Sequence, residues 1–254
     1  MEWHEAYEKV FPYCVRIDSE TGFGTGFLFA YNKNKKIAAI ATAAHVVNDV
    51  NWWLKPLRII HYQSNSSILL VPENRAIWID QQNRDAATVI VNAELLPFPE
   101  ATLPLLVPKH HLKIGVEVAW AGFPAIAPNN FCFFSGPISF FLESESTYLI
   151  DGVAINGVSG GPVFRKLTKD QALPELVGIV SAYRANRRAT DTLPGLLVAQ
   201  DITPVHEHLQ QMNNLDEAQE KAEKQKQEQE QEQEQKQKQQ EAKPENIERP
   251  KDKI

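Results

Sequence analysis

The stretch "INGVSGGPVF", residues 155–164, places three glycines and a proline around a single serine, Ser159. Glycine tolerates a positive φ and lets backbone or ligand approach closely, while proline withholds a backbone donor. Neither a regular helix nor a central strand favours this composition, so the segment predicts a tight, shaped turn. An ordinary hairpin loop can also contain Ser-Gly-Gly, and the rest of the chain must decide between such a loop and a site that presents Ser159.

Composition and charge exclude several classes of function. Of the 254 residues, 43% are hydrophobic, which is enough for a core, and the formal net charge of −6 with no basic stripe argues against nucleic-acid binding. Residues 1–13 carry glutamates where a signal peptide carries positive charge, and no segment reaches transmembrane length, so we expect a cytoplasmic protein without a membrane partner. Cys14 and Cys132 are far apart and lack metal-ligand spacing, so we expect no disulfide, metal or redox role.

Short β-rich runs separated by turn residues follow one another from about residue 14 to residue 202. Their even spacing, with no helical periods between them, predicts an all-β barrel or sandwich. The proline-containing stretch 95–111 divides the runs into two groups of similar size. We therefore expect two barrels with a break at this stretch.

Helical periodicity is expected only at the two ends of the chain. One short helix is predicted from Trp3 to about Pro12, and another from about Thr203. Beyond Leu215 the sequence is low in complexity and rich in Gln, Glu and Lys, so it cannot bury enough apolar surface to offset chain entropy. We predict one domain over residues 1–212 and a tail over residues 213–254 that is disordered or a lone helix and is available to a protein partner.

Three side chains suggest a catalytic group when they are taken together. Nucleophilic catalysis by serine needs a base to take its proton, a carboxylate to orient the base and donors for the oxyanion. His45 lies in the apolar run "ATAAHVV" at the end of a predicted strand, and Asp85 in "NRDAATVIV" immediately precedes a strand. Taken singly, His45 fits a core histidine and Asp85 a turn residue. Their order along the chain, His45, Asp85 and Ser159, with two in the first group of strands and one in the second, is more specific than any one of them.

These segments give the chain a clear resemblance to the trypsin-like serine peptidases, and within them to the HtrA-type and stand-alone bacterial branch. The resemblance covers roughly residues 10–210. It is carried by "GTGFLF" (24–29), "TAAHVV" (42–47), "DAATVIV" (85–91), "AGFP" (121–124) and "GVSGGPV" (157–163). It implies two six-stranded antiparallel β-barrels with the cleft between them, and a serine endopeptidase that needs no cofactor.

The resemblance also implies roles for individual residues. Ser159 matches the nucleophile, His45 the general base and acid, and Asp85, rather than the nearby Asp80, the residue that holds the imidazole. The backbone N–H groups of Gly157 and Ser159 match the oxyanion hole.

The substrate-binding residues follow from the same resemblance. Val153, six residues before the nucleophile, matches the base of the primary pocket, and Val180, Ser181, Ala182 and Tyr183 match the strand that lies along the substrate. An apolar base without a carboxylate disfavours Lys and Arg, so we expect a preference for a small or aliphatic side chain.

The chain departs from the digestive branch at Val158, where that branch has an acidic residue that pairs with a new N-terminus after cleavage. No such ion pair can form with valine. We therefore expect an enzyme made without zymogen activation. No PDZ domain is expected after residue 215, because that part of the chain lacks a core.

Two other functions remain open at this stage. The same fold can serve as a catalytically silent peptide-binding or scaffolding module, because fold alone does not determine function. A metal-dependent hydrolase would have to use His110 with His111, or His206 with His208, but these pairs lack HExxH or acidic ligands at workable spacing. We expect no bound metal, and we expect these histidines to be exposed on a linker and a helix.

Overall fold

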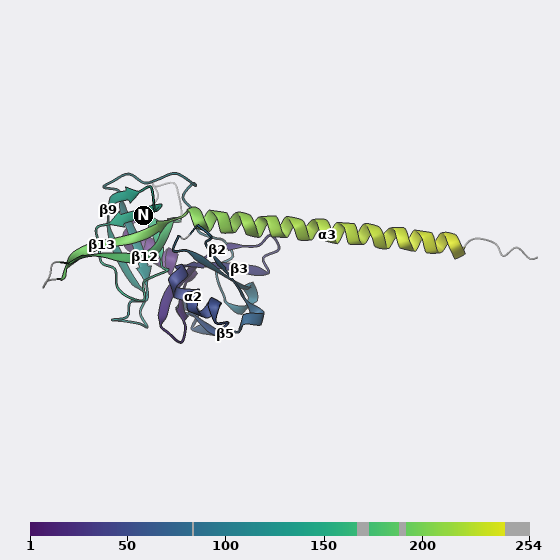
Figure 1. The fold of residues 1–254 in the computed structure, drawn as a ribbon, viewed down its shortest axis with the longest axis horizontal. Helices are drawn as coiled ribbons and strands as arrows, with labels where there is room; N and C mark the ends of the chain where they lie inside the picture. The colour runs from purple at the N-terminus through teal and green to yellow at the C-terminus, as the bar shows by residue number, and fades with distance from the viewer. Residues whose placement is uncertain (83, 167–172, 188–191, 242–254) are drawn as a thin grey trace, which may run out of the picture. The chain divides into compact units, whose positions relative to one another are not determined.

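A computed structural model of the chain describes residues 1–82, 84–166, 173–187 and 192–241 (Figure 1). It divides into two compact units, Met1–Gln211 and Met212–Ile254. All strands in the described ranges belong to the first unit. Among the described helices, none combines the length and the apolar character that crossing a membrane requires.

The first half of this unit is a seven-stranded antiparallel sheet with the strand order β5-β4-β1-β2-β3-β7-β6. Its strands are β1 (Cys14–Asp18), β2 (Phe23–Tyr31), β3 (Ile37–Thr42), β4 (Leu57–His61), β5 (Ser66–Leu70), β6 (Ala76–Ile79) and β7 (Ala87–Asn92). Strand β2 lies at the centre, pairs with β1 and β3, and is buried along its whole length except at its ends. This central position makes β2 a rigid base for the loops that meet its first residues.

The first sheet differs from the six-stranded barrel predicted from the sequence, because it has seven strands and its edge strands β5 and β6 are not paired with each other. The connection between these edges is the 3₁₀ turn Pro72–Asn74, and proline has no N–H to continue a ladder. The Arg75 guanidinium donates to the carbonyl oxygens of Leu70 at 2.7 Å and Lys55 at 2.5 Å. These carbonyl groups are therefore satisfied by a side chain rather than by another strand.

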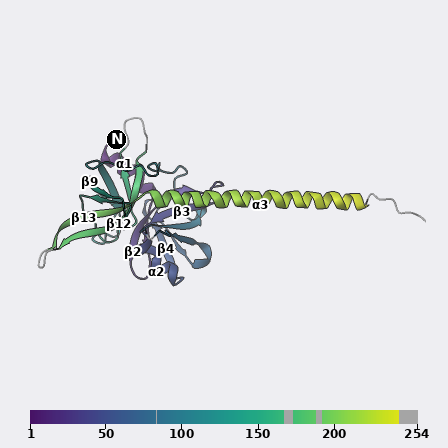
Figure 2. The same ribbon diagram turned by 45° about the horizontal axis from the view of Figure 1, so that its top comes forward.

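The second half is a closed six-stranded barrel with the order β10-β13-β12-β11-β8-β9, as predicted. Its strands are β8 (Glu117–Gly122), β9 (Cys132–Leu142), β10 (Thr147–Ile150), β11 (Pro162–Arg165), β12 (Glu175–Arg187) and β13 (Thr192–Asp201). Fully buried aromatic side chains, among them Trp120, Tyr148 and Phe164, fill its interior. The β12–β13 hairpin extends beyond the rest of the barrel (Figure 2). The all-β fold class is thus confirmed.

The two sheets are joined by the short 3₁₀ turn Ala93–Leu95 followed by irregular chain. Residues 96–116, all of which the structure describes, form one isolated bridge, Leu105 to Leu176, and otherwise neither strand nor helix. Leu103 and Leu106 of this connection are buried. The break expected at residues 95–111 falls within this segment.

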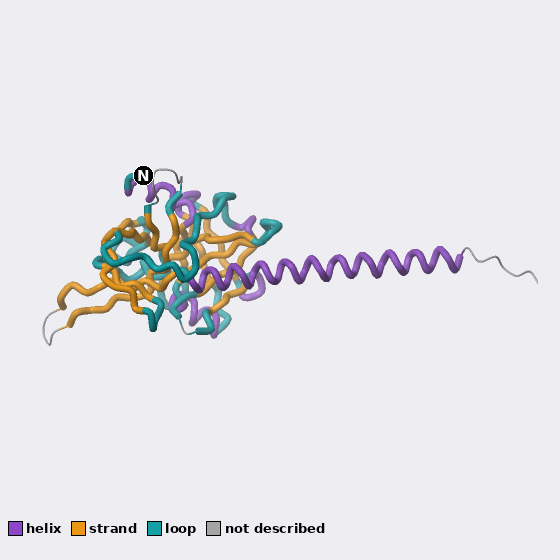
Figure 3. Tube along the Cα trace, turned by 90° about the horizontal axis from the view of Figure 1, so that it is seen from above, coloured by secondary structure: helices purple, strands orange, loops and turns teal. Residues whose placement is uncertain are grey.

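The helices match the prediction only in part. The short helix α1 (Trp3–Val10) ends just before Pro12 as predicted, whereas α2 (Ala44–Trp52) was not predicted. Helix α3 (Thr203–Glu241) has 39 residues instead of being short (Figure 3). Gln, Glu, Lys and Ala favour helix, and side chains four residues apart support one another, as Gln219 does by donating to Glu223 at 3.0 Å.

Deleting residues 216–254 is expected to leave folding and turnover nearly unchanged. No residue from 216 to 231 is buried, so their removal exposes no core. The melting temperature should change by less than about 2 °C, the shift that roughly 0.5 kcal/mol produces in a domain of this size. Differential scanning calorimetry would measure this shift. Val205→Ala, which shortens a side chain at a position only 1% exposed, serves as the destabilised comparison. A fall as large as that of Val205→Ala would show that the tail stabilises the domain.

Candidate active site

His45 lies in the first turn of helix α2, three residues after strand β3 ends at Thr42. The sequence-based placement of His45 at a strand end was therefore wrong. The helix forms because Val47 and Val50, three residues apart, are both buried on one side of it. The His45 side chain is 49% exposed, so its ring reaches the surface from a fixed backbone position.

Asp85 contacts His45 twice, just before strand β7. Its Oδ1 accepts the backbone N–H of His45 at 3.0 Å, and its Oδ2 lies 2.8 Å from the ring Nδ1. The same Oδ2 accepts a hydrogen bond from the Ser181 hydroxyl, on strand β12, at 2.5 Å. A carboxylate at Nδ1 favours the tautomer with its proton there, which leaves Nε2 as an acceptor.

These contacts set the charges of the pair. The hydrogen bond that His45 Nδ1 donates to Asp85 raises the pKa of His45 above its ordinary value, although burial alone would lower it. Burial by itself would raise the pKa of Asp85, but the hydrogen bonds and charge of His45, with the Ser181 hydroxyl, lower it overall. Asp85 is therefore ionised at neutral pH and stabilises the imidazolium form of His45.

Asp80, the other aspartate considered for this position, faces a different partner. Its side chain is only 3% exposed and its carboxylate pairs with the Arg84 guanidinium at 2.5 Å. Burial alone would raise the pKa of Asp80, but the hydrogen bonds and charge of Arg84 lower it overall. The structure thus brings Asp85, not Asp80, to His45.

The turn that carries Ser159 depends on two glycines with positive φ, Gly157 at +92° and Gly160 at +84°. A Cβ at Gly157 would lie 2.4 Å from the carbonyl oxygen of Phe123, and one at Gly160 would lie 2.1 Å from that of Thr25. Both the backbone conformation and the available space therefore require glycine at these two positions.

The N–H groups of this turn fall into two sets. Those of Val158, Gly160 and Gly161 donate to backbone carbonyl oxygens at 3.1, 2.7 and 2.9 Å. Those of Gly157 and Ser159 donate to no acceptor within the described residues. Buried backbone donors are nearly always paired, so two unpaired donors on either side of Val158 are available to an acceptor from outside the chain.

Thr25, on strand β2, connects the first sheet to the Ser159 turn and was missed by the sequence analysis. Its N–H donates to the Ser159 carbonyl oxygen at 2.8 Å, and its hydroxyl donates to that of Gly157 at 2.8 Å. The Thr25 side chain is fully buried. Thr25 belongs to the "GTGF" motif, but its partners are more than a hundred residues away in the sequence. No local pattern could therefore indicate these contacts.

His45, Asp85 and Ser159 line one pocket of about 290 Å³ together with Ala154, Ile155, Asn156 and Val180–Tyr183. Within the described residues no hydrogen bond joins Ser159 to His45. The expected substrate strand Val180–Tyr183 lies in this pocket. Val153 is not among the residues that line it. This residue is 57% exposed, and its carbonyl oxygen accepts a hydrogen bond from Trp120 Nε1 at 3.1 Å.

The other histidines lie outside this pocket. No group of three or more His, Cys, Asp or Glu with metal-binding geometry occurs in the described part of the chain. His110 and His111 are exposed as expected, but His206 is only partly exposed and His208 is buried, with its Nδ1 2.7 Å from the Thr88 hydroxyl. Burial lowers the pKa of His208. Helix α3 buries this ring because its first two turns pack on the first sheet.

The profile of the trypsin-like peptidase domain family matches residues 24–173 of this chain. This span exceeds half of the 254 residues, and the chain therefore belongs to that family. The resemblance inferred from the sequence is confirmed. No curated protein matches the chain in sequence.

Solved structures share the fold. The serine endoprotease from Yersinia pestis superposes with a TM-score of 0.59 at 19% identity, and the match covers 84% of this chain and 67% of that one. A protein named Deg5 superposes with a TM-score of 0.57 at 18% identity, and the match covers 82% of this chain and 94% of that one. At these identities the likeness is one of fold.

Proposed function

We propose that this protein is a serine endopeptidase that cleaves peptide bonds through Ser159, His45 and Asp85. The observation that carries the proposal is that the Asp85–His45 pair and Ser159 line one pocket, next to two backbone N–H groups without an internal acceptor. Membership of the family supports the proposal but does not by itself give activity.

In the first half of the proposed reaction, Ser159 Oγ attacks the carbonyl carbon of the scissile bond while His45 Nε2 takes the hydroxyl proton. Asp85 holds the ring at Nδ1 and stabilises the positive charge that develops on it. The N–H groups of Gly157 and Ser159 donate to the developing oxyanion, and one such donor is typically worth roughly 3 kcal/mol of transition-state stabilisation. His45 then gives its proton to the leaving amine, and an acyl-enzyme remains on Ser159.

In the second half, water attacks the acyl carbon and His45 takes a proton from it. The bond to Ser159 Oγ breaks, the carboxylic acid leaves, and His45 returns the proton to the serine. Every proton is exchanged among the substrate, water, His45 and Ser159, so the reaction requires no cofactor.

The proposal includes activity without zymogen cleavage. Val158 is fully buried, and its N–H is already bonded to the carbonyl oxygen of Ile155 at 3.1 Å. Valine offers no carboxylate for a new N-terminus, so the turn is held by backbone hydrogen bonds and by Thr25 instead.

The pocket also supports the expected substrate preference. The side chains beside Ser159 are mostly apolar or small, among them Ala154, Ile155 and Val180. Asp85 is the one carboxylate among its described lining residues, and it is already bonded to His45 and Ser181. A substrate Lys or Arg would lose hydration without a partner, so we propose that a small or aliphatic side chain precedes the cleaved bond.

A fluorophosphonate probe tests the proposed function, because the oxygen of an activated serine attacks its phosphorus and displaces fluoride, which leaves the serine covalently labelled. The wild-type protein should be labelled at a rate that rises with pH, because His45 must be neutral to accept the Ser159 proton. Since Asp85 raises the pKa of His45, the midpoint should lie above the reference value of about 6.5. Labelling is measured by mass spectrometry from pH 5 to pH 9.

The Ser159→Ala variant should not be labelled at any pH. Ser135→Ala, the same change at an exposed serine on strand β9, is the control and should be labelled like the wild type. A silent peptide-binding module would give no labelling of the folded wild-type protein, which would reject the peptidase.

A further inference from the structure

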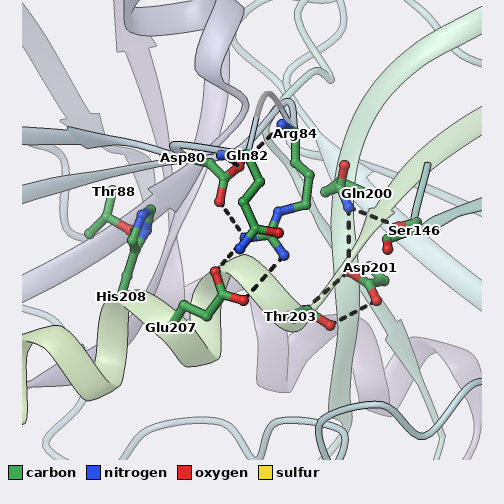
Figure 4. A network of polar contacts seen from close by, with 10 residues as sticks. All are labelled: Asp80, Gln82, Arg84, Thr88, Ser146, Gln200, Asp201, Thr203, Glu207 and His208. Carbon is green, nitrogen blue, oxygen red and sulfur yellow. Dashed lines mark hydrogen bonds and ion pairs between the residues drawn. The ribbon is translucent and has the colours of Figure 1, made fainter. Parts of the chain in front are cut away.

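The segment between strands β6 and β7, which carries Asp85, is folded around the Asp80 side chain (Figure 4). The Asp80 carboxylate accepts the backbone N–H groups of Gln82 at 2.8 Å and Arg84 at 3.1 Å, besides the Arg84 guanidinium. The Asp80 N–H donates to the Ala86 carbonyl oxygen at 3.0 Å, which closes the loop. These contacts fix the backbone on both sides of Asp85.

Arg84 extends this arrangement to helix α3. Its side chain is 10% exposed, and its guanidinium donates to both carboxylate oxygens of Glu207, one of them at 3.3 Å. A guanidinium bound to a carboxylate at two points fixes direction as well as distance. Arg84 is thus held between Asp80 on one side and Glu207 on the other (Figure 4).

The first two turns of α3 are a firm anchor for Glu207. Val205 is 1% exposed, His206 Nε2 lies 2.7 Å from the Leu106 carbonyl oxygen, and His208 is bonded to Thr88. The Asp201 carboxylate accepts the N–H and the hydroxyl of Thr203, at 3.2 and 2.8 Å, where the helix begins. Residues on both sides of Glu207 therefore keep its carboxylate in place.

Arg84 and Asp85 are adjacent in sequence. Each forms a hydrogen bond to a residue outside the first sheet, on either the second barrel or the helix that follows it. Asp85 accepts from Ser181 on β12, while Arg84 donates to Glu207 on α3. The two contacts hold neighbouring residues of one short loop from different directions. Loss of the contact between Arg84 and Glu207 would let the loop shift relative to His45.

We infer that Arg84 and Glu207 are positioning residues, through which the start of helix α3 holds Asp85 in register with His45. This inference rests on the proposed function for its effect on turnover, but the placement of Asp85 at His45 has a readout of its own. Because Asp85 raises the pKa of His45, a displaced Asp85 lowers that pKa toward the reference value of about 6.5. Among the described residues, Asp85 is the charged group that acts on the pKa of His45.

The test compares the full-length wild type with Glu207→Gln, Arg84→Met and the control Glu175→Gln. The control removes another carboxylate–arginine pair, Glu175 with Arg165 at 2.6 Å, that has no contact with the loop carrying Asp85. NMR of ring-labelled histidine gives the pKa of His45, identified by the signal missing in His45→Ala. Hydrolysis of a small peptide amide gives kcat and KM.

Glu207→Gln should lower the pKa of His45 and reduce kcat by about three- to tenfold with little change in KM, a fraction of the roughly hundredfold that a misplacement of about 1 Å can cost. Arg84→Met should reduce kcat further, and adding Glu207→Gln to it should cause little additional loss, because Glu207 acts through Arg84. Glu175→Gln should match the wild type in both readouts.

The results separate this inference from the proposed function. If Glu207→Gln has the kcat and His45 pKa of the wild type, helix α3 does not position Asp85 and the inference is wrong. If the wild type hydrolyses nothing but Glu207→Gln still lowers the pKa of His45, the positioning role holds and the peptidase proposal fails. If Arg84→Met does not fold, Glu207→Gln alone tests the inference. The Glu207 side chain is 45% exposed and glutamine has the same shape, so this variant should fold.

Discussion

Replacing Ser159 with alanine is expected to lower kcat on a small peptide amide by about a million-fold, the loss that removal of the nucleophile causes in other enzymes with a Ser-His-Asp triad. The reason is that, among the described residues that line the pocket, no other group is placed to form the acyl-enzyme. Ser181, the other serine of the pocket, already donates its hydroxyl to Asp85. The residual rate would come from the two N–H donors and from substrate binding.

The same variant should keep its fold and its affinity for peptides. Ser159 is partly exposed, and its structural contact is its carbonyl oxygen, which accepts from Thr25 and is unchanged by the substitution. Steady-state hydrolysis, calorimetry and binding of a fluorescent peptide measure the three properties, with Ser135→Ala as the matched control. Equal cleavage by the wild type and Ser159→Ala would reject the assignment of the nucleophile.

The sequence supplied those parts of the fold and site that depend on local pattern. Short apolar runs between turn residues predicted the strands, because burial on a sheet and the turns between strands both leave local signals. The glycines at 157 and 160 have positive φ and no room for a side chain, so their pattern alone indicated a constrained turn around Ser159. The histidine, aspartate and serine that were chosen by their order along the chain line one pocket in the structure.

Helix α2 was missed because its local sequence favours a strand. Val46, Val47 and Val50 are β-branched, and such residues have low helix and high strand propensity. Burial of Val47 and Val50 on one side outweighs this preference. The helix places His45 beyond the end of β3 and lets its backbone N–H reach Asp85.

The remaining features depend on residues far apart in sequence. Thr25 contacts the Ser159 turn, and Arg84 contacts Glu207 across 123 positions, and neither pairing has a periodicity or motif of its own. Val153 is not among the residues that line the pocket, because counting back from Ser159 gives a position along the chain and not a place in the pocket. Only the folded chain shows which side chains meet.

Replacing Asp85 with asparagine is expected to lower kcat by about ten-thousandfold, the cost of the same change in another enzyme with a Ser-His-Asp triad. Asparagine can donate its amide N–H to Nδ1, which favours a proton on Nε2, so the ring could no longer accept the Ser159 proton. Asp80→Asn should cost at most about a hundredfold, because it loosens the loop that positions Asp85 but leaves the Asp85 carboxylate at His45. The two substitutions remove one carboxylate each from the same loop and are matched controls for each other.

The pH dependence gives the second half of this prediction. In the wild type Asp85 raises the pKa of His45, so imidazolium persists above pH 6.5 or so and activity increases as the proton is lost through that raised value. Without the carboxylate the pKa of His45 falls, and the remaining activity of Asp85→Asn should reach its plateau at a lower pH than the wild type. Asp80→Asn keeps the Asp85 carboxylate but loosens the loop that carries it, so its midpoint should lie between those of the wild type and Asp85→Asn. Profiles of kcat/KM from pH 5 to pH 9 for the three proteins measure both effects. The assignment of Asp85 would be wrong if Asp80→Asn abolished hydrolysis while Asp85→Asn retained both the rate and the midpoint of the wild type.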